Sequence, residues 1–334
     1  MKVNQQYIAD LLKLSRVTVT KALQEHPDIS KSTVKKVKEA ADELGYIPNI
    51  VGRSLSTKKT NTIGLIVPKI NHSFFSTIIE EMYSKAKAFG YQIILMVSFE
   101  DEESELANVK SLLSMNVDGI IIDSVSTSTK DKSYELILKH QKPLIYFDRK
   151  PRSTKKAESI LFDDYNLSYK LTKALIDRGY KHIMYITGSQ EINVCYDRFS
   201  GFKTAMSDAT LDVPKKWILK AGLDKETSFN VFQTYLENNS KLPEAIVCVN
   251  DSVALGVYNA CKKHNIKIPD DISVVGFGDV KASNLVQPAL STVKLNLQEA
   301  SFSAVENLID LINNKPVSKN TIIDGEIIFR ESVK

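Results

Sequence analysis

Beyond residue 60, short runs of apolar and mostly β-branched residues alternate with segments of helical periodicity. The helical segments include Phe75–Phe89 and Glu103–Met115, each of which lies between two apolar runs. Strands that are apolar on both faces belong in parallel sheets covered by helices on both sides. We therefore expect an α/β fold with doubly wound parallel sheets. The first series of predicted strands is Ile63–Val67, Ile93–Val97, Gly119–Ile122, Leu144–Phe147 and Ile160–Phe162.

A second series with the same alternation follows, which predicts a second doubly wound lobe. A chain of 334 residues is long enough for two or three domains. The predicted helices of this lobe lie near Leu167–Arg178, Arg198–Asp208, Glu226–Asn238 and Val253–His264. Its predicted strands are His182–Ile186, Trp217–Leu219, Ala245–Val249 and Ser273–Val275.

The positive charge of the chain is concentrated in its first sixty residues. This segment carries 11 Lys and Arg against 6 Asp and Glu, a net charge of +5, whereas the remainder carries 33 against 34. A basic module beside a nearly neutral body indicates a nucleic-acid partner for the module alone. A lysine-rich solvated face is the alternative explanation of the charge.

The same segment has the pattern of three short helices. Ser15 is a suitable N-cap for a second helix over residues 16–24, Ser30 is a suitable cap for a third, and Gly45 is a suitable end. A tight turn separates the first two helices, as in a helix-turn-helix domain, here residues 1–46. The first helix is indicated by apolar residues at helical spacing, which are Ile8, Leu11 and Leu12.

Residues exposed at the start of the second helix of such a domain face the edges of DNA bases. Arg16 can form a bidentate pair with guanine, and Val17 can contact a thymine methyl group. Thr20 and Lys21 are on the same exposed part of this helix. The third helix carries lysines that fit phosphate contacts or solvated charges equally well, which are Lys35, Lys36 and Lys38.

The segment from Ile8 to Leu23 resembles the headpiece of the LacI/GalR family of bacterial transcription regulators, and residues 29–49 resemble the third helix and hinge entry of that family. The resemblance covers nearly the whole chain. It implies that Tyr7, Ser15 and Asn49 contact DNA together with the second helix. The family usually has glycine in the turn where this chain has Lys13, and a left-handed Lys13 would cost about 1 kcal/mol.

Residues 47–59 correspond in this resemblance to the hinge helix of the family. Leu55 then matches the leucine that each subunit of a dimer inserts into the minor groove, although an ordinary apolar linker residue would look the same. Gly52 stands where alanine is common, which costs a helix about 1 kcal/mol. We therefore expect the hinge to become helical only on DNA.

Residues 60–334 correspond to the effector-binding and dimerisation domain of the family. We expect a first lobe of about residues 60–161 and 291–322, and a second lobe of about 162–290 and 323–334. The segment from Leu290 to Phe329, with a helix over Glu299–Ile312, resembles the crossing between lobes in periplasmic sugar-binding proteins.

The main signatures of enzymes are missing from the sequence. No G-x-G-x-x-G follows a predicted strand, and neither a G-x-x-x-x-G-K-[ST] loop nor a G-x-S-x-G motif occurs. The five histidines and three cysteines lack metal-ligand spacing, and we expect Cys195, Cys248 and Cys261 to be buried free thiols. We predict no catalytic residues, no metal and no cofactor.

Several polar and aromatic residues lie where ligands of open α/β sheets bind, beyond the carboxyl ends of strands. Carboxylate, guanidinium and amide groups around an aromatic platform suit a polyhydroxylated ring, although each residue singly could be part of a turn, a cap or the core. Arg198 is expected to open a helix. The resemblance implies effector contacts for Phe74, Phe75, Asp148, Arg198, Asn250 and Asp279, and a structural role for Asp251.

Together these observations predict a dimeric, cytoplasmic regulator that binds operator DNA and is controlled by a small molecule, a sugar or sugar derivative, bound between the lobes. We expect a repressor, and both induction and co-repression fit the residues. No apolar stretch is long enough to cross a membrane, and no secretory signal is recognisable. The alternatives are a cytosolic sugar-binding protein and an α/β enzyme acting on sugars, both without a role in DNA regulation.

Overall fold

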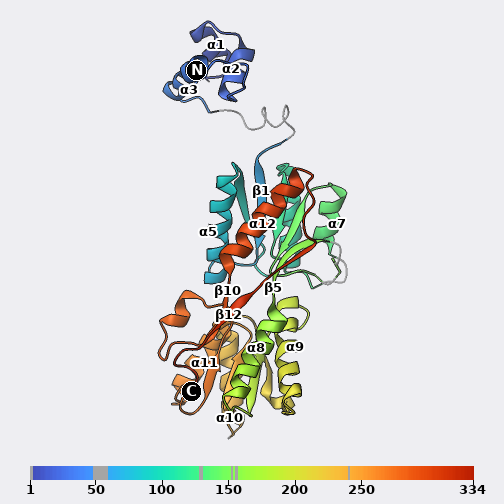
Figure 1. The fold of residues 1–334 in the computed structure, drawn as a ribbon, viewed down its shortest axis with the longest axis vertical. Coiled ribbons are helices and arrows are strands. Elements are labelled where there is room, and N and C mark those ends of the chain that lie inside the picture. The colour runs from blue at the N-terminus through green and yellow to red at the C-terminus, as the bar shows by residue number, and fades with distance from the viewer. Residues whose placement is uncertain (1–2, 48–58, 128–130, 152, 155–156, 240) are drawn as a thin grey trace. The chain divides into compact units, whose positions relative to one another are not determined.

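Figure 1 shows the computed structural model, which describes residues 3–47, 59–127, 131–151, 153–154, 157–239 and 241–334. Contacts within the chain divide it into two compact units, Met1–Thr60 and Asn61–Lys334, which we call the headpiece and the body. The predicted hinge residues Asn49, Gly52 and Leu55 lie outside the described residues. Within the described ranges, no helix is long and apolar enough to span a bilayer.

Three helices form the headpiece: α1 Gln5–Leu12, α2 Arg16–Leu23 and α3 Lys31–Glu43. Both predicted caps are confirmed, because Ser15 Oγ accepts a hydrogen bond from Thr18 N at 2.9 Å and Ser30 Oγ accepts one from Thr33 N at 3.2 Å. The helix-turn-helix prediction is confirmed as well. The helices enclose one small core of buried residues, which are Ile8, Ala9, Val19, Ala22, Val37, Ala40 and Ala41.

The turn between α1 and α2 has the left-handed backbone that a glycine usually supplies. Lys13 has φ 53° and ψ 41°, and Leu14 N donates to Ala9 O at 2.9 Å to close the turn. In this left-handed conformation, a residue with a side chain is less stable than glycine by about 1 kcal/mol. The chain therefore keeps the geometry of the turn in spite of its lysine.

The first lobe of the body is built on a six-stranded parallel sheet with the order β11-β5-β4-β3-β1-β2. Successive side chains of a strand face opposite sides of a sheet. On β1, Ile63 and Leu65 therefore pack with α5 and α12, whereas Ile66 packs with α6 and α7. The strands are β1 Thr62–Val67, β2 Gln92–Val97, β3 Gly119–Ile122, β4 Leu144–Phe147, β5 Glu158–Phe162 and β11 Asn320–Ile323, and the helices are α5 Ser73–Ala88, α6 Glu102–Ser114, α7 Lys132–Lys139 and α12 Leu297–Ile312.

The second lobe repeats this plan on a four-stranded parallel sheet with the order β7-β6-β8-β9. On β6, Ile183 and Tyr185 pack with α8 and α9, whereas Met184 and Ile186 pack with α10 and α11. The strands are β6 Ile183–Thr187, β7 Ile218–Lys220, β8 Ala245–Cys248 and β9 Ser273–Val275, and the helices are α8 Asp164–Asp177, α9 Asn193–Asp208, α10 Lys225–Asn238 and α11 Asp251–Lys263.

The C-terminal part of the chain passes between the lobes through an antiparallel pair of strands, β10 Thr292–Leu295 and β12 Gly325–Ile328 (Figure 1). We expected the first lobe to resume near residue 291. The structure differs, because Gly276 N donates to Ser291 O and Gly278 N donates to Val293 O, which attaches β10 to the segment after β9. The first lobe therefore resumes at α12.

Two helical features differ from the sequence-based expectations. The short helix α7 was not predicted, and α9 begins at Asn193 instead of Arg198. Val194 and Cys195 are buried in the first turn of α9. Their tertiary packing extends the helix, so Arg198 lies in its second turn.

Helices α8 and α9 pack closely at Gly201. A Cβ atom on Gly201 would lie 2.2 Å from Tyr165 O and 2.9 Å from Tyr169 N, both backbone atoms of α8. We expect Gly201→Ala to lower the free energy of unfolding of the body by about 1–3 kcal/mol, because the two helices must move apart. Urea denaturation followed by the fluorescence of the single tryptophan, buried Trp217, measures this.

The neighbouring half-buried Ser200 supplies the control. Ser200→Ala should change the free energy of unfolding by less than about 0.5 kcal/mol. Equal losses of unfolding free energy in the two variants would show that the close contact between α8 and α9 at Gly201 does not contribute to the stability of the body.

Candidate functional site

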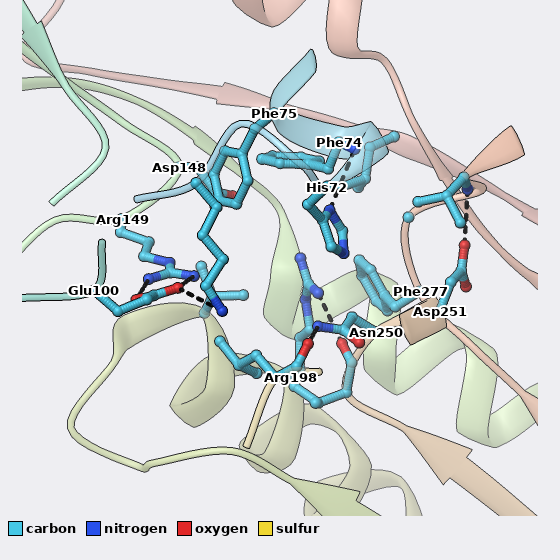
Figure 2. Close-up of a pocket in the computed structure, with 17 residues that line it drawn as sticks. His72, Phe74, Phe75, Glu100, Asp148, Arg149, Arg198, Asn250, Asp251 and Phe277 are labelled. Carbon is cyan, nitrogen blue, oxygen red and sulfur yellow. Dashed lines mark hydrogen bonds and ion pairs between the residues drawn. The ribbon is translucent and has the colours of Figure 1, made fainter. Parts of the chain in front are cut away.

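A cavity lies between the two lobes of the body (Figure 2). In each sheet the first strand lies between the second and the third, in the orders β2-β1-β3 and β7-β6-β8. The strand order therefore reverses at the first strand, and ligands of open α/β sheets bind beyond the carboxyl ends of the strands at such a point. Most of the lining comes from segments that follow β1, β2 and β4 in the first lobe and β6, β7, β8 and β9 in the second. The cavity has a volume of about 70 Å³.

Asp279 does not line this cavity, unlike the other predicted effector residues. Its Oδ1 accepts a hydrogen bond from Arg330 Nη2 at 2.7 Å. The preceding Gly278 has φ 130°, a backbone that residues with side chains rarely adopt, and the chain turns there. We therefore correct this assignment, since Asp279 holds the C-terminal segment. The predicted residues that do line the cavity are Phe74, Phe75, Asp148, Arg198 and Asn250.

Arg198 is fixed on several sides and is only 5% exposed. Its Nε donates to Asp164 Oδ1 at 2.7 Å, and its Nη1 donates to Val249 O at 2.8 Å. The guanidinium carbon lies 3.8 Å from the centre of the Phe277 ring. Burial disfavours the charge, but Asp164 and Asp148 outweigh burial and raise the pKa of Arg198. Among the described residues Nη2 has no hydrogen-bond partner, which leaves it for a ligand.

Asp148 follows β4 directly and has a left-handed backbone with φ 57°. It is buried, and its Oδ1 has no hydrogen-bond partner within the described part of the chain. Burial raises the pKa of this carboxyl, while Arg198 and Arg149 act in the opposite direction. A buried acceptor without a partner is unfavourable, so Asp148 is well placed to accept a hydrogen bond from a ligand.

Asn250 lines the cavity and also caps a helix. Its Oδ1 accepts from Val253 N at 2.8 Å at the start of α11, and its Nδ2 donates to Leu223 O at 3.0 Å. One amide N–H remains for a ligand. Its neighbour Asp251 has the structural role that the sequence suggested, because its carboxylate accepts hydrogen bonds from Thr292 Oγ1, Val280 N and Ser283 Oγ.

An ion cluster beside the cavity, in which Arg149 and Asp123 are buried and Glu100 and Lys69 are partly exposed, was missed by the sequence analysis. Arg149 donates from Nη1 to Glu100 Oε2 at 2.7 Å, and its Nε lies 3.7 Å from Asp123 Oδ1. Lys69 Nζ lies 3.9 Å from Glu100 Oε1. Burial, together with nearby Asp148, raises the pKa of Asp123 well above its ordinary value. The available signal was the position of Asp123 and Arg149 at or near the ends of apolar strands.

Two sets of hydrogen bonds join the lobes beside the cavity. His72 of the first lobe places Nε2 at 2.6 Å from Ser252 Oγ of α11. Asn193, the first residue of α9, accepts from Lys150 N and donates to Asp148 O, both at 3.1 Å. Sequence reasoning missed them because these partners are more than forty residues apart.

Within the described residues, no group of three or more potential ligands could hold a metal ion. The three cysteines are buried and free, as predicted. Burial raises the pKa of the Cys195 thiol to about 11 and that of the Cys261 thiol to about 12, and it also raises the pKa of Cys248. Thiols with such high pKa values are poor nucleophiles at neutral pH.

In the headpiece, the start of α2 carries exposed side chains. Arg16 and Val17 are exposed, Val17 by 65%. Thr20 Oγ1 donates to Gln5 Oε1 at 2.8 Å, and Lys21 Nζ donates to Asp28 Oδ2 at 2.8 Å. Arg16 and Val17 are therefore free to reach DNA, whereas Thr20 and Lys21 would share their polar atoms with these neighbours. The other predicted contacts are Tyr7, which is 36% exposed, and Ser15, the N-cap of α2.

A helix-turn-helix headpiece joined to a two-lobed body with a small-molecule cavity defines a ligand-controlled DNA-binding regulator. Two family models match the chain: the periplasmic binding proteins and sugar binding domain of the LacI family over residues 60–331, and the bacterial regulatory proteins of the lacI family over residues 6–49. The chain belongs to the LacI family of bacterial transcription regulators. It is a DNA-binding protein and not an enzyme.

Individual relatives agree with this assignment. The HTH-type transcriptional regulator RegA of Clostridium saccharobutylicum is 32% identical over 96% of both chains. The HTH-type transcriptional repressor PurR of Vibrio parahaemolyticus is 30% identical over 98% of this chain and 97% of its own. The fold is similar to that of the lac repressor dimer bound to operator and the anti-inducer ONPF, with a TM-score of 0.89, 22% identity and 99% coverage of both chains.

Proposed function

We propose that the protein is a dimeric repressor that acts in the cytoplasm and releases or binds its operator according to a small effector in the cavity of the body. The observation that carries the proposal is that one chain has both an exposed Arg16 and Val17 at the start of α2 and a cavity in the body that contains a fixed Arg198. DNA half-sites with two-fold symmetry require two headpieces, which is the reason for a dimer.

The polar groups of the cavity favour an uncharged ligand rich in hydroxyl groups, such as a sugar. Arg198 is paired with Asp164, and Arg149 with Glu100, so neither guanidinium is free to neutralise an anion. Asp148 offers an acceptor oxygen without a partner in the described structure. The rings of Phe74 and Phe75 supply an apolar surface for the carbon face of a sugar ring.

Control follows if effector and operator favour different conformations of the same dimer. Effector binding closes the two lobes on the ligand and changes how the paired bodies present the headpieces. The free energy of coupling in such systems is about 1–3 kcal/mol, which corresponds to about a 5- to 150-fold change in operator affinity.

The function is tested by selection of an operator from a library of random duplexes with the full-length protein. We expect a selected two-fold symmetric duplex to bind at least about 1,000-fold more tightly than a random duplex at the same salt concentration. Binding of both duplexes should weaken as salt increases, because phosphate contacts release counterions. A panel of neutral sugars then identifies an effector by its change in operator affinity.

The selection also separates the proposal from its rivals. Enrichment of no sequence, with sugar binding retained, would identify a sugar-binding protein without a regulatory role. Chemical conversion of a bound sugar would identify an enzyme. Either outcome would contradict the proposed function.

A further inference from the structure

The tight turn that carries Asp148 is held from both lobes. Asp148 has φ 57°, and Arg149 N donates to Phe147 O at 2.6 Å across it. A three-residue turn with a positive φ at its central residue is strained. In the first lobe, Asp148 N donates to Ile160 O of β5 at 2.9 Å. The carbonyl of Asp148 and the N–H of Lys150 find their partner in the second lobe.

Asn193 of the second lobe is the partner of both backbone groups. Its Nδ2 donates to Asp148 O and its Oδ1 accepts from Lys150 N, each at 3.1 Å. Within the described residues, neither backbone group has another hydrogen bond. A backbone carbonyl only accepts and a backbone N–H only donates, so the two partners together fix the orientation of the Asn193 amide.

These contacts exist only while the lobes are closed beside the cavity. Asn193 is the half-buried first residue of α9 and directly precedes Val194, which lines the cavity from the second lobe. Asp148 and Arg149 line it from the first lobe. Opening of the cleft would separate Asn193 from the turn and leave the strained backbone of Asp148 without this support.

The helix that carries Asn193 also carries Arg198, which is fixed within the second lobe by Asp164 and Val249. Asp148 Oδ1 is a buried acceptor without a partner in the described structure. The direction of the Asp148 side chain depends on the backbone of its turn. Asn193 therefore determines where the acceptor of the first lobe lies relative to the donor of the second.

We propose that Asn193 is a positioning residue for effector binding: when the lobes close, its amide fixes the turn at Asp148 and so places the Asp148 carboxyl at a set distance from Arg198. This inference rests on the proposed effector cavity. A ligand that joins Arg198 to Asp148 favours the closed body, because only the closed body holds both groups in place. Effector affinity then depends on a side chain that need not touch the effector.

The role requires asparagine, because one short side chain must both donate and accept. Aspartate would keep an acceptor for Lys150 N but would turn a second oxygen toward Asp148 O. In the first turn of α9, by contrast, aspartate is favourable, because its charge lies at the positive end of the helix dipole. Asn193→Asp therefore separates the positioning of Asp148 from a role in starting α9.

The first measurement follows the turn without any effector, by hydrogen exchange and mass spectrometry of the full-length protein. We expect the Lys150 amide to exchange at least about tenfold faster in Asn193→Ala than in the parent protein, because it loses its acceptor. Glu191→Ala is the matched control, since Glu191 is exposed in the same loop, and it should leave this exchange unchanged. Equal exchange in the parent protein and Asn193→Ala would contradict the positioning role.

The second measurement is a titration with the neutral pentose or hexose that changes operator affinity most in the parent protein. We expect Asn193→Ala to weaken sugar binding by about 5- to 150-fold, as for the loss of two hydrogen bonds. Asn193→Asp should weaken it at least as much, and Glu191→Ala should bind as the parent does. Urea denaturation followed by Trp217 fluorescence checks that each variant is folded. Restored affinity in Asn193→Asp would identify a residue that only starts α9 and would overturn the proposal.

A double variant shows whether Asn193 acts through Asp148. Asp148→Gly removes the carboxyl, and glycine accepts the positive φ of the turn. In that background, Asn193→Ala should weaken sugar binding by less than about a further twofold. An equal loss in both backgrounds would show that Asn193 acts independently of Asp148, against the proposal. If no sugar changes operator affinity in the parent protein, the proposed function fails, whereas the exchange measurement still decides whether Asn193 holds the turn.

Discussion

Arg198→Ala is expected to lower the free energy of unfolding of the body by about 3–5 kcal/mol, because it leaves Asp164 as a buried charge without its partner. Asp164 is 4% exposed and accepts from Arg198 Nε at 2.7 Å. The substitution also leaves Val249 O without a donor from Nη1. Urea denaturation followed by Trp217 fluorescence measures the loss.

A surface pair provides the matched control for this prediction. Lys173 and Asp177 form an ion pair at 2.8 Å with side chains that are 54% and 60% exposed. Lys173→Ala should cost less than about 1 kcal/mol. The double variant Arg198→Ala/Asp164→Asn should recover part of the loss, because it removes the unpaired charge. If Arg198→Ala cost no more than Lys173→Ala, the pair with Asp164 would not stabilise the body.

Arg198→Ala should also remove the response to effector, because Nη2 is the donor that the pocket leaves for a ligand. The measurement is a titration of the variant with a sugar that affects the parent protein. It is made without urea, at a temperature where Trp217 fluorescence shows that the body of the variant is folded. Unchanged effector affinity would exclude Arg198 from the site, whatever its effect on stability.

Arg16→Ala is expected to weaken operator binding by about 1–3 kcal/mol for each headpiece, and a dimer carries two. Since 1.4 kcal/mol is a factor of ten, the combined loss is tenfold at the least. Arg16 is the first residue of α2, is exposed, and has no ion pair within the described headpiece. Binding of random duplexes should decline much less, because it depends on total phosphate contacts.

The control for Arg16 is Lys35 on α3, whose side chain is 77% exposed and only 3.8 Å from Glu39. Lys35→Ala should weaken operator and random duplexes to a similar extent and reduce the salt dependence by about one charge. Salt-matched titrations of both variants on both duplexes decide between the two roles. Equal losses on the two duplexes for Arg16→Ala would identify Arg16 as a phosphate contact.

The local features of the fold could be predicted from the sequence because the interactions that determine them are local. Ser15 and Ser30 cap helices through backbone groups three residues away. The strands Gly119–Ile122 and Leu144–Phe147 were predicted with their observed bounds, since both are apolar on each face. Lys13 adopts the left-handed turn because the helices on either side require it.

The resemblance to a known family placed most of the cavity, and where it failed the reason was a long-range contact. The expected effector contact Asp279 binds Arg330, which is 51 residues further along the chain. Val194 and Cys195 lengthen α9 through burial that no periodicity indicates. These features depend on which segments the lobes bring together.

The sequence did not indicate which side chains at the site form pairs with residues far away in the chain. Arg198 and Asp164 are 34 residues apart, and His72 and Ser252 are 180 residues apart and lie on opposite lobes. A pattern of polarity tells which side chains are buried or capped, because it reflects interactions within a few residues. Which donor meets which acceptor across a cleft depends on the packing of whole lobes, and only the tertiary structure decides it.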